Sequence, residues 1–240
     1  MACVWPIGTL QPVTQLRCLG VVTLMQALFI GQTYIDVTFL TDRMPSGDEK
    51  HGRRARVIAP SALNRVLRYV SRHPDPTRSR VILLLSVKAG LPAAEIAKLE
   101  WSMVLDANCR IGDVIEVRDG IAKKGAGRTI PIHPDLRASL ARLLRDGARD
   151  GPVIQSSRGG AMRPNSIVNW FVVLYRETGL DGCSSHSGRR TFITHAARLL
   201  HKSGGSLRDI QLLAGHRSID TTQGYIDGDS HAQRKLISLL

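Results

Sequence analysis

The sequence lacks the cysteine and histidine patterns that mark metal sites and redox centres. Its 240 residues include four cysteines, at positions 3, 18, 109 and 183, and no two of them form a C-x-x-C pair. Zinc-binding and redox-active cysteines usually occur in such pairs. His195 also has no H-E-x-x-H neighbour, which is the spacing of a helical zinc site. We therefore expect four free thiols, no metal and no other cofactor.

The sequence also lacks an apolar segment long enough to span a membrane. The apolar run from Cys18 to Gly31 is interrupted by Thr23 and Gln26, and a spanning helix needs about 20 apolar residues. A secretory signal peptide begins with positively charged side chains, whereas the residues before Arg17 include none. We therefore expect neither a membrane partner nor an export signal.

Acidic side chains are scarce. The chain has 20 acidic and 33 basic residues, a formal net charge of +13. Residues 1–50 hold three of the basic and four of the acidic residues, which leaves 30 and 16 for residues 51–240, a net charge of +14. Such a surplus suits a nucleic acid and predicts binding that weakens with salt. Charge alone would fit a ribosomal or a membrane-surface protein equally well, so other residues must identify the partner.

Hydrophobic periodicity predicts one mainly helical domain over residues 57–240. Segments with the apolar pattern of helices lie at 61–70, 81–87, 134–144 and 186–200. The second of these is almost entirely apolar, which is typical of a buried helix. Strands are expected at 114–117 and within 121–132. About 180 residues suffice for a single core, so the expected fold class is α+β, mainly α-helical, with one small antiparallel β-sheet.

A widely spaced set of reactive residues occupies the last quarter of the chain. It consists of His186-x-x-Arg189, Gly215-His216 and Tyr225. His186 and Arg189 are three positions apart, so on a helix they share one face, and Ser184 or Ser185 is expected to cap that helix. Unpaired N–H groups and the helix dipole favour an anion at this end, where an arginine adds a bidentate donor. These residues therefore predict a phosphate-binding site.

The predicted elements bring a tyrosine toward this site. A helix is expected over 206–214 and ends at Gly215, a residue typical of helix C-termini. His216 then lies at an exposed corner, and a further helix that begins at Ser218 or Asp220 is expected to carry Tyr225. A tyrosine has an ordinary pKa of about 10, so it needs nearby cations or a base to act as a nucleophile. Attack on a phosphodiester would yield a phosphotyrosine ester, which permits rejoining without ATP or a metal.

Four segments give the chain its resemblance to a known family. They are AGLPAAEIAKLEWSMV (89–104), IAKKGAGRTIPI (121–132), HSGRRTFITHAA (186–197) and LLAGHRSIDTTQGYID (212–227). In this order they resemble the T-G-L-R box, the lysine-bearing β-hairpin, the H-x-x-R helix and the L-G-H…Y segment of the tyrosine recombinase (phage integrase) family. The resemblance covers about residues 57–238 and is specific because all four segments occur in order.

The resemblance implies a role for each residue of the set. Tyr225 would attack the scissile phosphate and form a 3′-phosphotyrosine intermediate. Arg189 and His216 would hold the non-bridging oxygens, and His186 would assist proton transfer. Lys123 would protonate the leaving 5′ oxygen, and it is preferred over its neighbour Lys124 because it lies eight residues before Pro131, as the family's lysine does.

The chain departs from the family pattern at Pro92, where the family's box has its first phosphate-binding arginine. Gly90 can end the preceding helix, Pro92 fits the first position of the next, and Glu95 falls in its first turn. Loss of one preorganised cation typically slows a reaction by about 10²–10³, so weakened or absent activity is expected unless another cation compensates. Lys88 is near in sequence, and Arg190 is expected to face solvent or the DNA backbone.

By the same resemblance, the partners are double-stranded DNA and other copies of this chain, in a homo-tetramer on paired sites. A recombinase or integrase of a plasmid or other mobile element, located in a bacterial cytoplasm, is the leading interpretation. Residues 1–56 remain unassigned and are expected to be a truncated or degenerate core-binding region. Two alternatives stay open: a non-catalytic DNA-binding relative, and an activity like that of type IB topoisomerases. The resemblance implies that the apolar residues of 232–240 dock on a neighbouring protomer, and packing on their own domain is the alternative that stays open.

Overall fold

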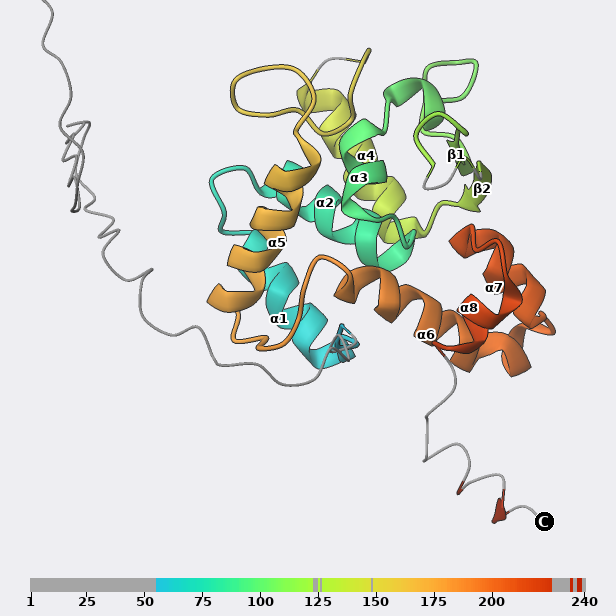
Figure 1. Cartoon of the computed structure of the whole chain (residues 1–240). Helices are drawn as coiled ribbons and strands as arrows, with labels where there is room; N and C mark the ends of the chain where they lie inside the picture. Colours follow the sequence, from blue (N-terminus) through green and yellow to red (C-terminus); the bar gives the residue numbers. More distant parts are fainter. Residues whose placement is uncertain are drawn as a thin grey trace, which may run out of the picture. The chain divides into compact units, whose positions relative to one another are not determined.

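A computed structural model describes residues 55–122, 125, 127–147, 149–225, 234 and 237–238 (Figure 1). Lys123, nearly all of the N-terminal segment 1–56 and most of the C-terminal segment 232–240 lie outside the described residues. The predicted boundary between residues 56 and 57 therefore stays a prediction, as does the docking of the C-terminal segment. The unit considered below falls within His51–Leu240.

The described part of the chain is mainly helical, with a small two-stranded sheet, as predicted. Its elements are α1 (Pro60–Val70), α2 (Pro76–Lys88), α3 (Ala93–Lys98), the 3₁₀ turn η1 (Trp101–Met103), β1 (Val114–Val117), β2 (Arg128–Pro131), α4 (Pro134–Asp146), α5 (Pro164–Glu177), α6 (Ser187–Ser203), α7 (Leu207–Ala214) and α8 (Ile219–Gln223). The two strands are antiparallel, with Ile115 opposite Ile130 and Val117 opposite Arg128. Within the described residues, no helix is both long enough and apolar enough to cross a bilayer.

Proline sets the start of four helices. Pro60, Pro76, Pro134 and Pro164 are the first residues of α1, α2, α4 and α5. A helix's first N–H has no partner within the helix, so proline loses nothing there and its fixed φ favours the helical turn. In α2, the Asp75 side chain also accepts a hydrogen bond from the Arg78 N–H. These positions explain why the helices begin where they do.

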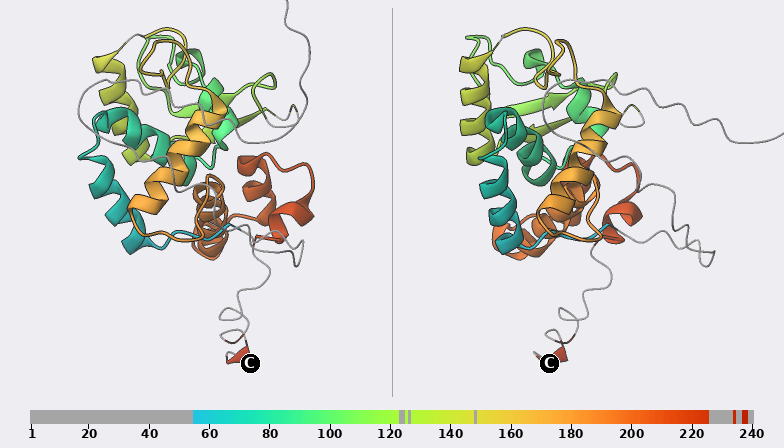
Figure 2. Two further views of the ribbon diagram at one scale, coloured as in Figure 1. Left: turned by 60° about the vertical axis from the view of Figure 1, so that its left-hand side comes forward. Right: turned by 90° about the vertical axis from the view of Figure 1, so that its left-hand side faces the viewer.

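The buried helix predicted at 81–87 lies within α2, at the centre of the core. Residues Val81 to Leu85 are at most 1% exposed, and α2 packs against α1, α3, α4 and α6. A helix that is apolar on all sides is stable only when other elements cover every face. In Figures 1 and 2, α7 and α8 lie next to each other beside α6, which connects them to this core.

Helices α2 and α6 pack closely where Gly188 faces Ser86. A Cβ atom added at Gly188 would lie 2.2 Å from the Ser86 Oγ atom and 2.8 Å from the Ser86 Cβ atom. Rotation of the serine side chain can move its oxygen but not its Cβ atom. Glycine at 188 therefore allows the first turn of α6, which carries Arg189, to rest on the core helix.

We expect Gly188→Ala to destabilise the fold despite alanine's higher helix propensity. Alanine gains up to about 1 kcal/mol over glycine within a helix, whereas overpacking a core typically costs about 1–3 kcal/mol. Because the fixed Ser86 Cβ atom is in the way, the net loss should be about 1–2 kcal/mol, measured by urea denaturation. Gly120→Ala is the control, since nothing lies within 4 Å of an added Cβ there. Equal stability of both variants would refute the close-packing argument.

Candidate active site

Arg189 joins three separate segments of the structure. It lies in the first turn of α6, and its half-buried side chain reaches two backbone carbonyls. Nη1 donates to the Gly90 oxygen at 2.7 Å and Nη2 donates to the Ala214 oxygen at 2.5 Å. The guanidinium group thus connects the turn after α2, the start of α6 and the end of α7.

The Arg189 guanidinium group has a perturbed charge environment. Burial lowers its pKa below the ordinary value of an arginine, and the nearby positive charge of Arg128 lowers it further. The Glu95 carboxylate acts in the opposite direction, as do the charge of Tyr225 and a side-chain hydrogen bond between Tyr225 and Arg189. A cation whose charged form is disfavoured by burial and that lies beside a tyrosine is typical of a functional site.

A buried ion pair lies beside this arginine. The Arg128 Nη2 and Glu95 Oε2 atoms are 2.7 Å apart, and the two side chains are only 6% and 2% exposed. Arg128 Nε also donates to the Leu213 oxygen at 2.9 Å. The sequence pattern placed Glu95 near a helix start and did not pair it with Arg128. A glutamate within the apolar segment AAEIAK was the available signal, since a buried carboxylate requires a partner.

His216 follows α7 at the predicted corner, but it is half-buried there and not exposed as expected. Gly215 before it adopts φ +65°, the left-handed conformation that ends α7. The His216 Nδ1 atom is 2.9 Å from the Thr222 Oγ1 atom, and the Gln211 side chain donates to the His216 backbone oxygen at 3.0 Å. These contacts fix the imidazole ring against the segment that leads to the tyrosine.

Tyr225 lies beside both Arg189 and His216. The tyrosine and histidine rings stack, with centroids 5.5 Å apart and planes inclined by 20°. The tyrosine is half-buried and packs on a small apolar cluster formed by α6 and α7. The expectation that a helix would carry Tyr225 is wrong, because α8 ends at Gln223 and Tyr225 follows Gly224. A residue just outside a short helix depends on side-chain contacts for its position.

Arg190 lies beside the tyrosine, a contact that the sequence did not predict. Its guanidinium carbon lies over the Tyr225 ring, 5.5 Å from the centroid, and the residue is half-buried, so the expected exposure to solvent is only partial. The expected contact with the DNA backbone stays a prediction. Arg189 and Arg190 are neighbours in α6, and both interact with the tyrosine. Arg189 does so electrostatically, whereas the Arg190 guanidinium group lies over the ring.

His186 is at the start of the same helix but is not joined to the other residues by any described contact. It is the N-cap residue of α6, and its side chain is exposed. The expected caps Ser184 and Ser185 precede it. Ser184 instead accepts a hydrogen bond from the His186 N–H at 3.3 Å. The structure therefore brings Arg189, His216 and Tyr225 together and leaves His186 one turn before Arg189.

Pro92 and Lys88 flank the turn that Arg189 contacts. Pro92 was expected to be the first helical residue of α3, but it is the N-cap, one position before the helix begins at Ala93, with φ −71° and ψ 158°. Lys88 Nζ lies 3.3 Å from the His133 Nε2 atom. The His133 pKa is lowered first by burial and then by the charge of Lys88. Lys88 is thus engaged with His133 at the start of α4.

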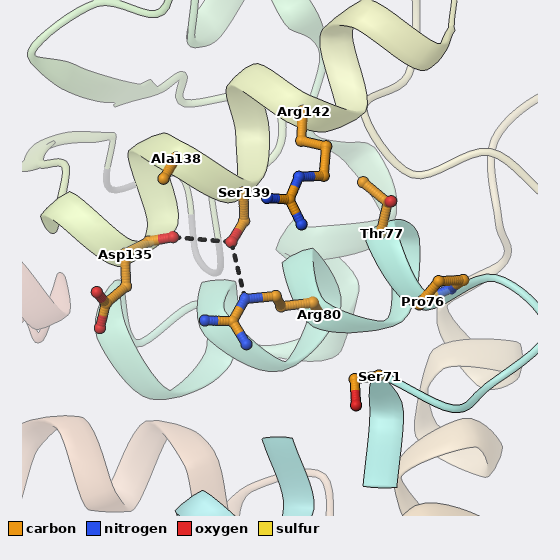
Figure 3. A pocket seen from close by; sticks show the side chains of 8 residues that line it. All are labelled: Ser71, Pro76, Thr77, Arg80, Asp135, Ala138, Ser139 and Arg142. Atoms are coloured by element: carbon orange, nitrogen blue, oxygen red, sulfur yellow. Dashed lines mark hydrogen bonds between the residues drawn. The ribbon is translucent and has the colours of Figure 1, made fainter. Parts of the chain in front are cut away.

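One cavity of about 360 Å³ lies near the ends of α1 and the starts of α2 and α4. Figure 3 shows Arg80, Ser139 and Arg142 on its walls, with Arg80 Nε donating to Ser139 Oγ. None of the four described candidate site residues lines it. The tyrosine site is therefore separate from this cavity.

We expect the buried pair to stabilise the site much more than an exposed pair does. Glu95→Gln keeps the shape of the side chain but leaves the Arg128 charge buried without a counter-ion, which typically costs about 3–5 kcal/mol. Asp113→Asn is the matched control, because it breaks an exposed ion pair: the Arg137 side chain is 40% exposed and the Asp113 side chain 95%. The free energy of unfolding should therefore change little. Urea denaturation of both variants measures the difference. Similar losses would contradict a special role for the Glu95 carboxylate.

Comparison with curated proteins identifies tyrosine recombinases as relatives. The chain is 32% identical to tyrosine recombinase XerA of Pyrococcus furiosus over 155 residues, which are 63% of this chain and 50% of the relative. It is 39% identical to tyrosine recombinase XerC of Nitrobacter winogradskyi over 158 residues, or 64% and 46% of the two chains. The matched region spans about half the length of these relatives.

Solved structures of recombinases share the fold. XerA recombinase superposes with a TM-score of 0.61 at 22% identity, over 76% of this chain and 64% of the other. A lambda integrase dimer bound to a COC′ core site gives a TM-score of 0.58 at 20% identity, over 76% and 62%. The predicted fold is thereby confirmed. Since the sequence model of the phage integrase family also matches residues 56–231, the chain belongs to that family.

Proposed function

We propose that this protein cuts and rejoins DNA at specific sites through a 3′-phosphotyrosine intermediate on Tyr225. One observation carries the proposal: the Tyr225 side chain interacts electrostatically with the Arg189 guanidinium group while its ring stacks on His216. This is the combination that a tyrosine needs, because cations and polar groups at the hydroxyl favour the attacking phenolate. Membership of the phage integrase family supports the same chemistry.

In the proposed reaction, the Tyr225 oxygen attacks phosphorus and the bond to the 5′ oxygen breaks. Arg189 and His216 hold the non-bridging oxygens, where negative charge develops. His186 assists proton transfer, and Lys123 donates a proton to the leaving 5′ oxygen. The reverse attack by a 5′ hydroxyl group rejoins the strand and frees the tyrosine. Side chains provide the positive charge, so the mechanism requires no metal.

Double-stranded DNA is the proposed partner, and a mobile element is the proposed context. The net charge of +13 suits phosphate contacts. Among the proteins with the same fold are a lambda integrase dimer bound to a core site and the Tn1549 transposon integrase in complex with a circular intermediate DNA. The latter has a TM-score of 0.58 at 18% identity. Integration or excision of a plasmid, phage or transposon is the corresponding role.

We expect Tyr225→Phe to abolish covalent attachment to a suicide substrate made from DNA flanking the gene. The variant lacks the attacking oxygen but keeps the phosphate contacts, so DNA binding should be nearly unchanged. EDTA should have no effect, since the charge comes from side chains. The adduct is detected as a DNA-linked band in denaturing gels. Tyr69→Phe, at an exposed tyrosine, is the control and should retain activity.

Three outcomes would contradict this proposal. Cleavage by the Tyr225→Phe protein would mean that another group attacks the phosphate. Loss of cleavage in EDTA would indicate a metal-dependent reaction. Specific DNA binding by the parent protein without any adduct would favour the alternative of a non-catalytic DNA-binding relative. A requirement for two specific sites separates recombination from relaxation of the kind catalysed by type IB topoisomerases.

A homo-tetramer on paired sites is the proposed assembly, with residues 232–240 docking on a neighbouring protomer. This segment has four apolar residues near its end and is too short to be stable as an isolated helix. Its deletion should leave the melting temperature of the monomer nearly unchanged and weaken higher-order complexes on paired sites, measured by native gels. A large drop in the monomer's melting temperature would show that the segment packs on its own domain.

A further inference from the structure

Arg190 has an unusual position among the arginines around the tyrosine. The Arg189 guanidinium group donates to two backbone carbonyls and interacts electrostatically with Tyr225. Arg128 bonds to Glu95 and to the Leu213 carbonyl. Within the described residues, Arg190 forms no ion pair and no side-chain hydrogen bond, and its one described side-chain interaction is with the Tyr225 ring. Its five N–H donors are therefore available to a ligand.

We propose that Arg190 is a second phosphate-binding arginine of this site. Its guanidinium group binds a non-bridging oxygen of the phosphate that Tyr225 attacks, and its contact with the ring keeps it beside the reacting oxygen. The assignment rests on the proposed function in one respect, namely that Tyr225 is the nucleophile. It gives a specific phosphate partner to a residue that was expected to face solvent or the DNA backbone.

The charge that develops during the reaction favours a second guanidinium group. A phosphodiester has two non-bridging oxygens, and attack by an oxygen anion increases the negative charge that they share. Arg189 has both terminal nitrogens engaged with carbonyl oxygens, so only part of its donor capacity remains for these oxygens. An arginine that is already held in place loses little conformational freedom when it binds, which strengthens such a contact.

The turn that Arg189 contacts offers no such donor. The Gly90 carbonyl that Arg189 binds belongs to the turn Gly90–Pro92, and proline has neither a cationic side chain nor an N–H group. Lys88, which precedes this turn, lies against His133. Among these described neighbours, Arg190 is the cation that combines proximity to Tyr225 with uncommitted donors.

The first test measures anion binding without DNA. Orthovanadate, which mimics a phosphate under attack, is titrated into the full-length protein and followed by NMR signals of Arg190 and His216. Arg190→Gln should weaken its binding by at least about tenfold, as expected for loss of one charge-assisted contact. Arg176→Gln removes the same charge at an exposed position on α5 and should change binding less than about twofold. Equal binding by parent and Arg190→Gln proteins would overturn the proposal.

The second test uses the suicide substrate in a mutant cycle. Arg190→Gln should slow adduct formation by about 10²–10³, whereas Arg190→Lys keeps the charge and should lose less. Pro92→Arg places a guanidinium group in the turn Gly90–Pro92, which Arg189 contacts. This change should restore much of the rate of adduct formation in the Arg190→Gln protein and add little to the rate of the parent protein. Equal gains from Pro92→Arg in both backgrounds would show that the two positions do not share a role.

A third measurement separates phosphate contact from a purely structural effect. When the scissile phosphate is replaced by an uncharged methylphosphonate, the penalty of Arg190→Gln should largely vanish, because the oxygen charge that it neutralises is gone. A penalty that persists would mean that Arg190 only orders Tyr225. If the parent binds orthovanadate through Arg190 but forms no adduct, the phosphate site stands and the recombinase function fails. Unchanged melting temperatures of the variants establish that each is folded.

Discussion

The C-terminal end of α7 is the junction on which the site depends. The carbonyls of Leu213 and Ala214 accept hydrogen bonds from Arg128 and Arg189. The last carbonyls of a helix have no hydrogen-bond partner within it and carry a partial negative charge. The two arginines provide both the missing donors and a compensating positive charge. Since Gly215 and His216 come directly afterwards, these bonds also fix the path of the chain toward the tyrosine.

Two guanidinium groups this close to each other require an anion. Arg128 lowers the pKa of Arg189, and the Glu95 carboxylate opposes that effect. Glu95 comes from α3, Arg128 from β2 and Arg189 from α6. The ion pair therefore joins the core of the domain to the last helices, and a change at any of the three residues alters both stability and the geometry at Tyr225.

The position of Arg190 links the departure at Pro92 to the rest of the site. Proline is well suited to the N-cap of α3, because its extended conformation (ψ 158°) leads into the helix. With proline at this position, the turn Gly90–Pro92 that Arg189 contacts has no positively charged side chain. A free guanidinium group over the Tyr225 ring supplies positive charge from another direction. Pro92 thus suits the start of α3, whereas Arg190 supplies the positive charge near Tyr225.

The sequence by itself determined the class of fold, the family and most of the helices. Periodic apolar residues and the prolines at helix starts act over a few positions, so α2, α4 and the end of α7 at Gly215 were predictable. So were the candidate residues Arg189, His216 and Tyr225, because they stand in ordered segments. Only the tertiary structure decided which of them touch. Glu95 and Arg128 are 33 positions apart, and Arg190 meets Tyr225 only because α6, α7 and α8 fold together. Neighbouring helix residues point about 100° apart, so their contacts depend on how the helices pack, which no short sequence pattern specifies.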